Sequence, residues 1–125
     1  MGKFSRFIRY WLPPIVWMAF IFYLSSRLSV TVTGKFLFDF LIFKALHMIE
    51  YAILYFLLFR AFYSVNNNLL FPVIFSILYA VLDEFHQTFV PTREGKIRDV
   101  IVDTVGIILM YIYINSHMNF VKKFL

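Results

Sequence analysis

The sequence predicts an all-α integral membrane protein, a bundle of four transmembrane helices with both termini in the cytoplasm. The chain is 62% hydrophobic and 15% charged, its mean hydropathy is +0.78, and its apolar residues form continuous runs. Soluble domains use roughly half apolar and about a quarter charged residues. A soluble domain of this size would also leave about a third of its unfolded surface exposed to water. Lipid is therefore the expected solvent.

Four apolar segments have the length of a membrane-spanning helix, which is ~20 residues. They cover residues 7–24, 41–62, 69–85 and 99–116. The first follows a basic stretch, as in a signal peptide, but no small-residue cleavage motif follows it and further apolar segments do. We expect a retained first span and one transmembrane domain over residues 1–125.

The basic residues near the span ends predict the orientation, because cytoplasmic loops are enriched in Lys and Arg. Four spans place six basic residues on each side, which is a tie. Three of them precede the first span, which usually dominates, and several on the opposite side lie among acids. Both termini are therefore predicted to be cytoplasmic. All the acidic residues then lie on the outer side: Asp39, Glu50, Asp83, Glu84, Glu94, Asp99 and Asp103.

Two protein classes are excluded by composition. The chain has no cysteine, so it has neither a disulfide framework nor a thiolate metal site. Its net charge of +5 comes from short basic clusters beside apolar runs, not from one basic stripe. Such clusters are typical of contacts with anionic lipid headgroups, so we expect a lipid bilayer as partner and no nucleic acid.

Polar side chains recur at helical spacing near the outer ends of three spans. These stripes are Lys44, His47, Glu50 and Tyr51 in the second span, Tyr79, Asp83, His86 and Gln87 in the third, and Asp99 and Asp103 in the fourth. Ionisable residues inside a span almost always face the bundle interior or a water-filled cavity. We expect the three stripes to converge into one pocket open to the outer surface, with Lys44, His47, Arg93 and Arg98 as partners of the buried acids.

The residue types in this pocket permit more than one role. His47 or Glu50 could act as a general base and Asp83 or Glu84 as an acid. Arg93 and Arg98 suit a phosphate or carboxylate, because guanidinium binds such groups in a bidentate manner. Alternatively, His47 and Glu50 form an internal pair that fixes helix packing, and the arginines contact headgroups or pair with Asp83 and Asp99.

A metal site is a weaker alternative. Zinc catalysis usually needs three protein ligands, and His47, His86 and an acid such as Glu50 or Asp103 could supply them. Their spacing matches no strong metal motif, so no metal or other cofactor is predicted.

Two further predictions concern packing. Trp11, Trp17 and Tyr23 are interpreted as anchors at the membrane interface. Gly106 lies one helical turn after Asp103 and is predicted to permit close approach of another helix.

Several sequence blocks carry a family resemblance. They are F-Y-L-S-S at 22–26, K-A-L-H-M-I-E-Y at 44–51 with Arg60-Ala61 later in that span, Y-A-V-L-D-E-F-H-Q-T-F-V-P-T-R at 79–93, and D-V-I-V-D-T-V-G at 99–106. On these blocks the chain resembles the VanZ-like family of small bacterial membrane proteins. The resemblance implies a multi-pass protein of the bacterial plasma membrane. The founding member of the family is linked to low-level resistance to teicoplanin, a lipid-bearing glycopeptide.

The resemblance also carries over characteristic polar positions: Lys44, His47, Glu50, Tyr51, Arg60, Asp83, Glu84, His86, Gln87, Arg93, Asp99 and Asp103. Together with the stripes they give two sets of candidate residues. The catalytic candidates are His47, Glu50, Asp83 and Glu84. The substrate-binding candidates are Lys44, Tyr51, His86, Gln87, Arg93, Arg98, Asp99 and Asp103.

Three functions fit these residues. The first is a non-transporting pocket on the outer face that binds an envelope headgroup, a lipid-linked wall precursor or an amphiphilic glycopeptide, with an effect on antibiotic tolerance. The second is a membrane-surface enzyme acting on a lipid-linked substrate. The third is a structural or partner-binding protein whose polar residues only lock helices together. The sequence leaves open which one holds, and it fixes neither the ligand nor the oligomeric state.

Overall fold

The computed structural model describes residues 2–26, 35–67, 69–90 and 97–125. These residues form the helices α1 (Lys3–Ser26), α2 (Phe36–Asn66), α3 (Leu70–Gln87), α4 (Ile97–Ser116) and α5 (Met118–Val121), followed by the 3₁₀ helix η1 (Lys122–Phe124). No strand occurs in the described ranges. The predicted all-α class is confirmed.

Three helices are long and apolar enough to cross a membrane. Their spanning segments are Lys3–Ser25 in α1, Leu37–Asn66 in α2 and Leu70–Gln87 in α3. The fourth predicted span forms the helix α4, which is not among these three segments of the described chain. A fourth crossing and cytoplasmic termini therefore stay predictions.

α2 begins earlier than the predicted span, at Phe36 instead of Leu41. The residues between them are apolar except for Asp39, so nothing in the sequence stops the helix there. With 31 residues, α2 is roughly 46 Å long at ~1.5 Å per residue. It exceeds the ~30 Å hydrocarbon core, so it must tilt or extend past it. Glu50 consequently lies about four turns into its helix, because α2 begins at Phe36 and not at Leu41.

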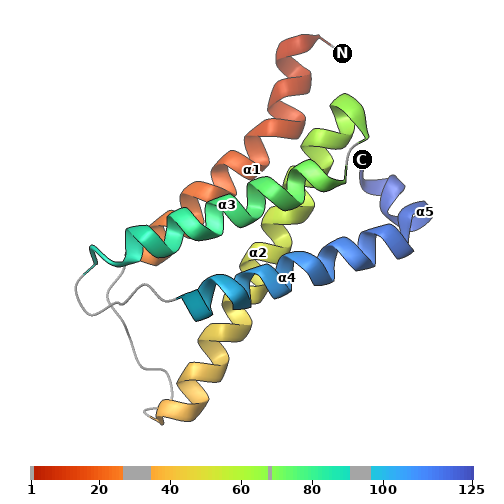
Figure 1. Ribbon diagram of the computed structural model, residues 1–125. Helices are drawn as coiled ribbons and strands as arrows, with labels where there is room; N and C mark the ends of the chain where they lie inside the picture. The colour runs from red at the N-terminus through yellow and green to blue at the C-terminus, as the bar shows by residue number, and fades with distance from the viewer. Residues whose placement is uncertain (1, 27–34, 68, 91–96) are drawn as a thin grey trace.

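α2 is the central helix of the bundle. It packs against α1, α3 and α4, and α3 also packs against α4 and α1. Figure 1 shows α1 and α3 running next to each other while α2 crosses behind α4. The core is built largely from one end of α2, where Tyr51, Leu54, Tyr55 and Phe59 are fully buried.

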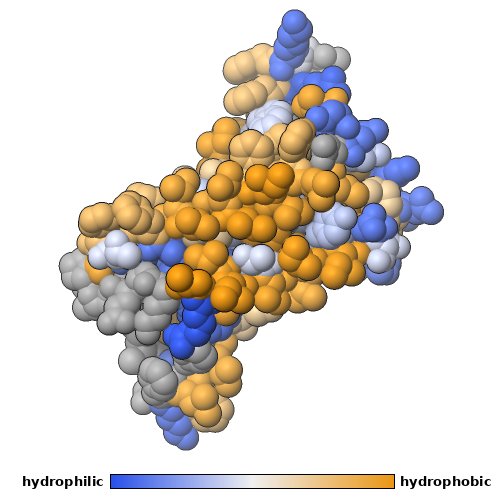
Figure 2. Space-filling view, in the orientation of Figure 1, coloured by the Kyte–Doolittle hydropathy of each residue, from blue (hydrophilic) through white to orange (hydrophobic). Residues whose placement is uncertain are grey.

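The outer surface of the bundle is apolar. Large hydrophobic side chains are exposed along all four long helices, for example Val16 in α1, Leu41 in α2, Leu82 in α3 and Ile101 in α4. Figure 2 shows hydrophobic residues over the middle of the molecule and hydrophilic ones towards its ends. Soluble monomers rarely expose contiguous apolar patches larger than a few hundred Å². Lipid is the solvent that such a surface fits.

The two ends of the chain lie at one end of the molecule. In Figure 1 the start of α1, the end of α2 and the short helices after α4 are all found there. The short helices are held by Arg60 of α2, whose Nε donates a hydrogen bond of 2.9 Å to the carbonyl oxygen of Phe124. The sequence analysis did not predict these short helices.

Candidate functional site

A glycine sets the distance between α2 and α4. A Cβ atom added to Gly106 would lie 2.3 Å from the carbonyl oxygen of Met48 and 3.0 Å from its Cα. Only a residue without a side chain fits against the α2 backbone at this point. The predicted close approach at Gly106 is confirmed, and it brings the polar faces of the two helices together.

Polar side chains meet across this contact. The Lys44 ammonium pairs with the Asp99 carboxylate, which joins α2 to the first turn of α4. One turn deeper, His47 Nδ1 lies 3.6 Å from Oδ1 of Asp103. The same nitrogen is 3.8 Å from Oε2 of Glu50 on its own helix. His47 therefore lies between two carboxylates.

α3, which packs against both α2 and α4, completes the arrangement. The Tyr51 hydroxyl donates a buried hydrogen bond of 2.9 Å to Oδ2 of Asp83. Asp103 of α4 lies within electrostatic reach of Asp83, Glu84 and Glu50. The three stripes thus converge. We call this group the polar cluster: Lys44, His47, Glu50, Tyr51, Asp83, Glu84, Asp99 and Asp103.

The polar cluster has an accessible rim and a buried floor. The side chains of Lys44, Asp99, His47 and Glu50 keep between 13% and 20% of their surface exposed. Asp103 beneath them is fully buried. The neighbouring floor residues Tyr51, Asp83 and Glu84 are buried as well. A group that approaches the rim therefore meets the imidazole before it meets the deep carboxylates.

On the floor of the polar cluster, neither carboxylate oxygen of Asp103 has a hydrogen bond in the described part of the chain. The amide nitrogen Nε2 of Gln87, which is 97% buried on α3 outside the cluster, has none either. Leaving a buried polar group unbonded costs about 1–3 kcal/mol. Such groups in a native structure are often functional or bind water or an ion. The floor of the polar cluster is therefore the best candidate for a ligand-facing surface.

α1 is joined to α2 and α3 by hydrogen bonds from side chains to backbone carbonyls. Trp17 Nε1 donates to the Glu50 carbonyl oxygen at 2.9 Å, so this side chain joins α1 to α2. The Tyr79 hydroxyl donates to the Met18 carbonyl oxygen at 2.5 Å, which joins α3 to α1. Neither tie was predicted, because backbone carbonyls leave no sequence signal.

Some candidate residues lie outside the polar cluster. His86 faces α1, where its ring stacks on Phe22 with centroids 4.2 Å apart. Gln87 is buried one turn beyond Asp83, and in the described part of the chain its side chain forms no hydrogen bond to the cluster. Arg98 is exposed in the first turn of α4. Arg93 lies outside the described residues.

The possible metal ligands do not form a donor set among the residues that the structure describes. Among the described residues, no three His, Asp or Glu side chains are grouped so that they could hold a metal ion. His47 and His86 are directed to different neighbours, Asp103 and Phe22 respectively. The metal alternative has no geometric support in the described part of the chain.

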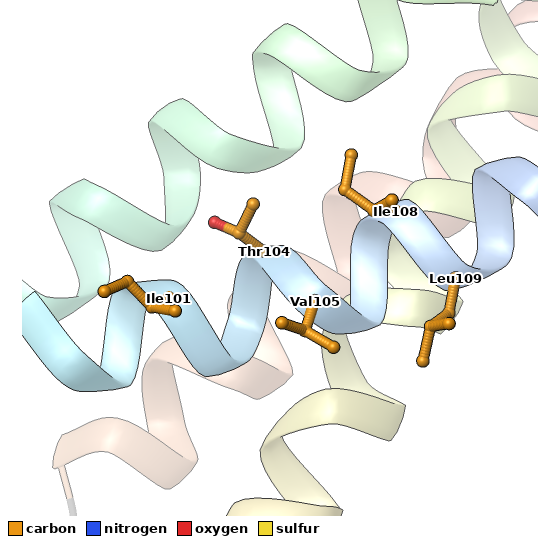
Figure 3. Close-up of a pocket in the computed structure, with 5 residues that line it drawn as sticks. All are labelled: Ile101, Thr104, Val105, Ile108 and Leu109. Carbon is orange, nitrogen blue, oxygen red and sulfur yellow. The ribbon is translucent and has the colours of Figure 1, made fainter.

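A shallow apolar cavity of about 290 Å³ lies on α4, away from the polar cluster. It is lined by Ile101, Thr104, Val105, Ile108 and Leu109, which Figure 3 shows projecting from this helix. At ~100° per residue these positions lie on the side of α4 opposite Asp103. An almost entirely apolar lining suits an acyl chain and not a charged headgroup.

Comparison with known proteins gives one family. The family model described as VanZ/LLP1 matches residues 7–118, nearly the whole chain. Searches of curated proteins and of solved structures gave no match.

Proposed function

The chain belongs to the VanZ/LLP1 family, and from this premise we propose that it is a multi-pass protein of the bacterial plasma membrane whose polar cluster binds an envelope headgroup at the outer face. The ligand class is a lipid-linked wall precursor or an amphiphilic glycopeptide. Occupancy of the site by a glycopeptide would link the protein to antibiotic tolerance.

The path of the chain supports four crossings with both termini in the cytoplasm. α4 has 20 residues, or about 30 Å of helix, which equals the thickness of the hydrocarbon core. It returns the chain to the end of the molecule where α1 begins (Figure 1). Three crossings would leave the termini on opposite sides. The basic residues at this shared end then favour the cytoplasmic side.

The convergence of the polar cluster carries the proposal. A buried charge within a membrane is expensive, and such residues mark substrate paths or binding sites unless they only pair with each other. Asp103 is fully buried and none of its oxygens has a hydrogen bond in the described part of the chain. If these residues served only to hold the helices together, we would expect each buried polar group to have a hydrogen-bond partner, as the Tyr51 hydroxyl has in Asp83.

The rim supplies groups of both charges to a ligand. Lys44 and Asp99 already neutralise each other, so a headgroup that displaces one of them gains the other. Arg98 at the start of α4 adds an exposed cation near this pair. A phosphorylated headgroup with hydroxyl or amide groups matches this mixture, because it accepts from cations and donates to carboxylates.

Lipid identification tests the proposal directly. The protein is purified in mild detergent, its bound lipids are extracted and identified by mass spectrometry, and the binding constant of the enriched lipid and of teicoplanin is measured. We expect His47→Gln and Asp103→Asn to lose binding while they stay folded. His117→Gln, an exposed histidine near the other end of α4, is the matched control. Binding that is equal in all four proteins would contradict the proposal.

One observation favours the enzyme as a second candidate. Both carboxylates approach the same ring nitrogen of His47, Nδ1, at 3.6 Å and 3.8 Å. A carboxylate at Nδ1 orients an imidazole whose Nε2 then acts as the general base. Turnover of the enriched lipid separates the two functions: an enzyme loses turnover in His47→Gln but keeps substrate binding, whereas a binding protein releases no product even as wild type.

A further inference from the structure

Basic residues gather at the end of the molecule opposite the polar cluster. This basic end consists of Lys3, Arg6, Arg9, Arg60, Lys122 and Lys123. Figure 2 shows hydrophilic residues there, at the same end as the two termini in Figure 1. Within the described part of the chain, none of these six side chains forms an ion pair. Their charge is therefore available to an external anion.

Two of the arginines are held in place by backbone carbonyls. Arg60 donates from Nε to the Phe124 oxygen at 2.9 Å and from Nη1 to the Arg9 oxygen at 3.5 Å. Arg6 donates from Nη2 to the Ser64 oxygen at 2.9 Å. A guanidinium group has five N–H donors, so each of these two arginines keeps unused donors after these hydrogen bonds are made. The remaining donors are thus fixed in position before any ligand arrives.

Two guanidinium groups share one aromatic ring. The Cζ atoms of Arg9 and Arg60 lie 5.4 Å and 5.1 Å from the centroid of the Tyr10 ring. Each contact is favourable as a cation–π interaction, but the two like charges repel each other near a medium of low dielectric constant. An anion that lies between the two guanidinium groups offsets this repulsion and accepts hydrogen bonds from both of them.

Exposed apolar side chains lie on the same segments as these arginines and their hydrogen-bond partners. Phe4 and Phe7 of α1 are 77% and 49% exposed, and Phe120 and Phe124 beyond α4 are 49% and 52% exposed. Inorganic phosphate would pair with the arginines but would not contact these exposed phenylalanine rings. A phosphate that carries acyl chains covers them and pairs with the arginines in the same complex.

We propose that Arg6, Arg9 and Arg60 form a binding site for the phosphodiester of an anionic phospholipid, with its acyl chains lying against the phenylalanines of α1 and of the C-terminal segment. The site is separate from the polar cluster and does not depend on its function. The bound lipid joins α1, α2 and the C-terminal segment, because the arginines contact the backbone of all three.

Native mass spectrometry in mixed micelles of phosphatidylglycerol and phosphatidylcholine tests this site. We expect the wild-type protein to retain phosphatidylglycerol selectively. Each basic residue near an anionic surface contributes about 1 kcal/mol, so Arg9→Gln and Arg60→Gln should each lower retention about fivefold. Lys35→Gln removes the same charge from the exposed start of α2 at the other end, and it should leave retention unchanged.

Arg9→Gln keeps the test valid if Arg60→Gln fails to fold, since in the described structure the Arg9 side chain lies over the Tyr10 ring and makes no hydrogen bond or ion pair. Equal retention of the two lipids by the wild type would overturn the proposal. An equal loss in Arg9→Gln and Lys35→Gln would overturn it too, because it would show a general charge effect. Displacement of the lipid by millimolar inorganic phosphate would contradict the role of the acyl chains.

Discussion

The α2–α4 contact at Gly106 yields a prediction whose sign and size follow from the structure. In Gly106→Ala the new methyl group would lie 2.3 Å from the Met48 carbonyl oxygen. Ordinary contact begins at ~3.5 Å, so the two helices must part by about 1 Å. The obstructing atom belongs to the backbone, so a side-chain rotation does not relieve the clash.

Two effects of this substitution oppose each other. Alanine is a better helix former than glycine by about 1 kcal/mol. Overpacking costs about 1–3 kcal/mol, and a rigid backbone partner places this case near the upper value. We expect a net loss of about 1–2 kcal/mol in the free energy of unfolding. Parting of the helices should also lengthen the separation of His47 and Asp103 from 3.6 Å and weaken ligand binding.

The assay is reversible unfolding by sodium dodecyl sulfate in mixed micelles, followed by far-ultraviolet circular dichroism. Gly2→Ala is the matched control, because a Cβ atom at Gly2 has nothing within 4 Å. The control should unfold like the wild type. If Gly106→Ala is as stable as the wild type, or more stable, then α4 does not cross α2 at this point and the assembly of the polar cluster described above is wrong.

The remaining predictions concern the polar cluster. Asp103→Asn should leave the free energy of unfolding unchanged or raise it by about 1 kcal/mol, because it replaces a buried acidic group whose oxygens make no hydrogen bond in the described part of the chain, while headgroup binding is lost. Tyr51→Phe should cost about 1–3 kcal/mol in the same unfolding assay, since the buried oxygen of Asp83 loses its donor. A double-mutant cycle of Lys44→Met and Asp99→Asn should give a coupling energy on the order of 1 kcal/mol for their partly exposed pair.

Each of these results has a contrary outcome. A strong destabilisation by Asp103→Asn, with ligand binding intact, would make this carboxylate a structural group. A neutral Tyr51→Phe would mean that α3 does not approach α2 at Asp83. A coupling energy of zero would indicate that Lys44 and Asp99 do not interact in the membrane.

The helices could be predicted because each apolar run is continuous and long. The predicted start of α2 was less accurate, because the apolar residues before Leu41 extend this helix to Phe36. The short helices after Ser116 were missed, and the hydrogen bond from Arg60 to Phe124 that joins them to α2 is a long-range contact with no signal in the sequence. Intervals of three and four residues also predicted that Lys44, His47 and Glu50 share a face, and Asp99 and Asp103 another.

Contacts between helices were only partly predictable. Gly106, one helical turn after Asp103, predicted a close crossing, but its partner Met48 has no distinguishing property in the sequence. The periodicity of α3 placed His86 with Asp83, whereas the folded chain stacks the imidazole on Phe22 of α1. Trp17 and Tyr79 donate to backbone carbonyls, which every residue carries, so their partners follow only from the packing of the helices.

The central claim is that helices distant in sequence place their ionisable side chains in a single buried cluster. Solid-state nuclear magnetic resonance tests it through the ¹⁵N–¹³C dipolar coupling between labelled histidine and labelled aspartate in bilayers. A His86→Gln, His117→Gln background leaves His47 as the sole histidine. We predict a coupling between His47 Nδ1 and the carboxyl carbon of Asp103, whose Oδ1 atom lies 3.6 Å from that nitrogen, and we expect this coupling to be lost in Asp103→Asn. Absence of the coupling, or its persistence in Asp103→Asn, would contradict the claim.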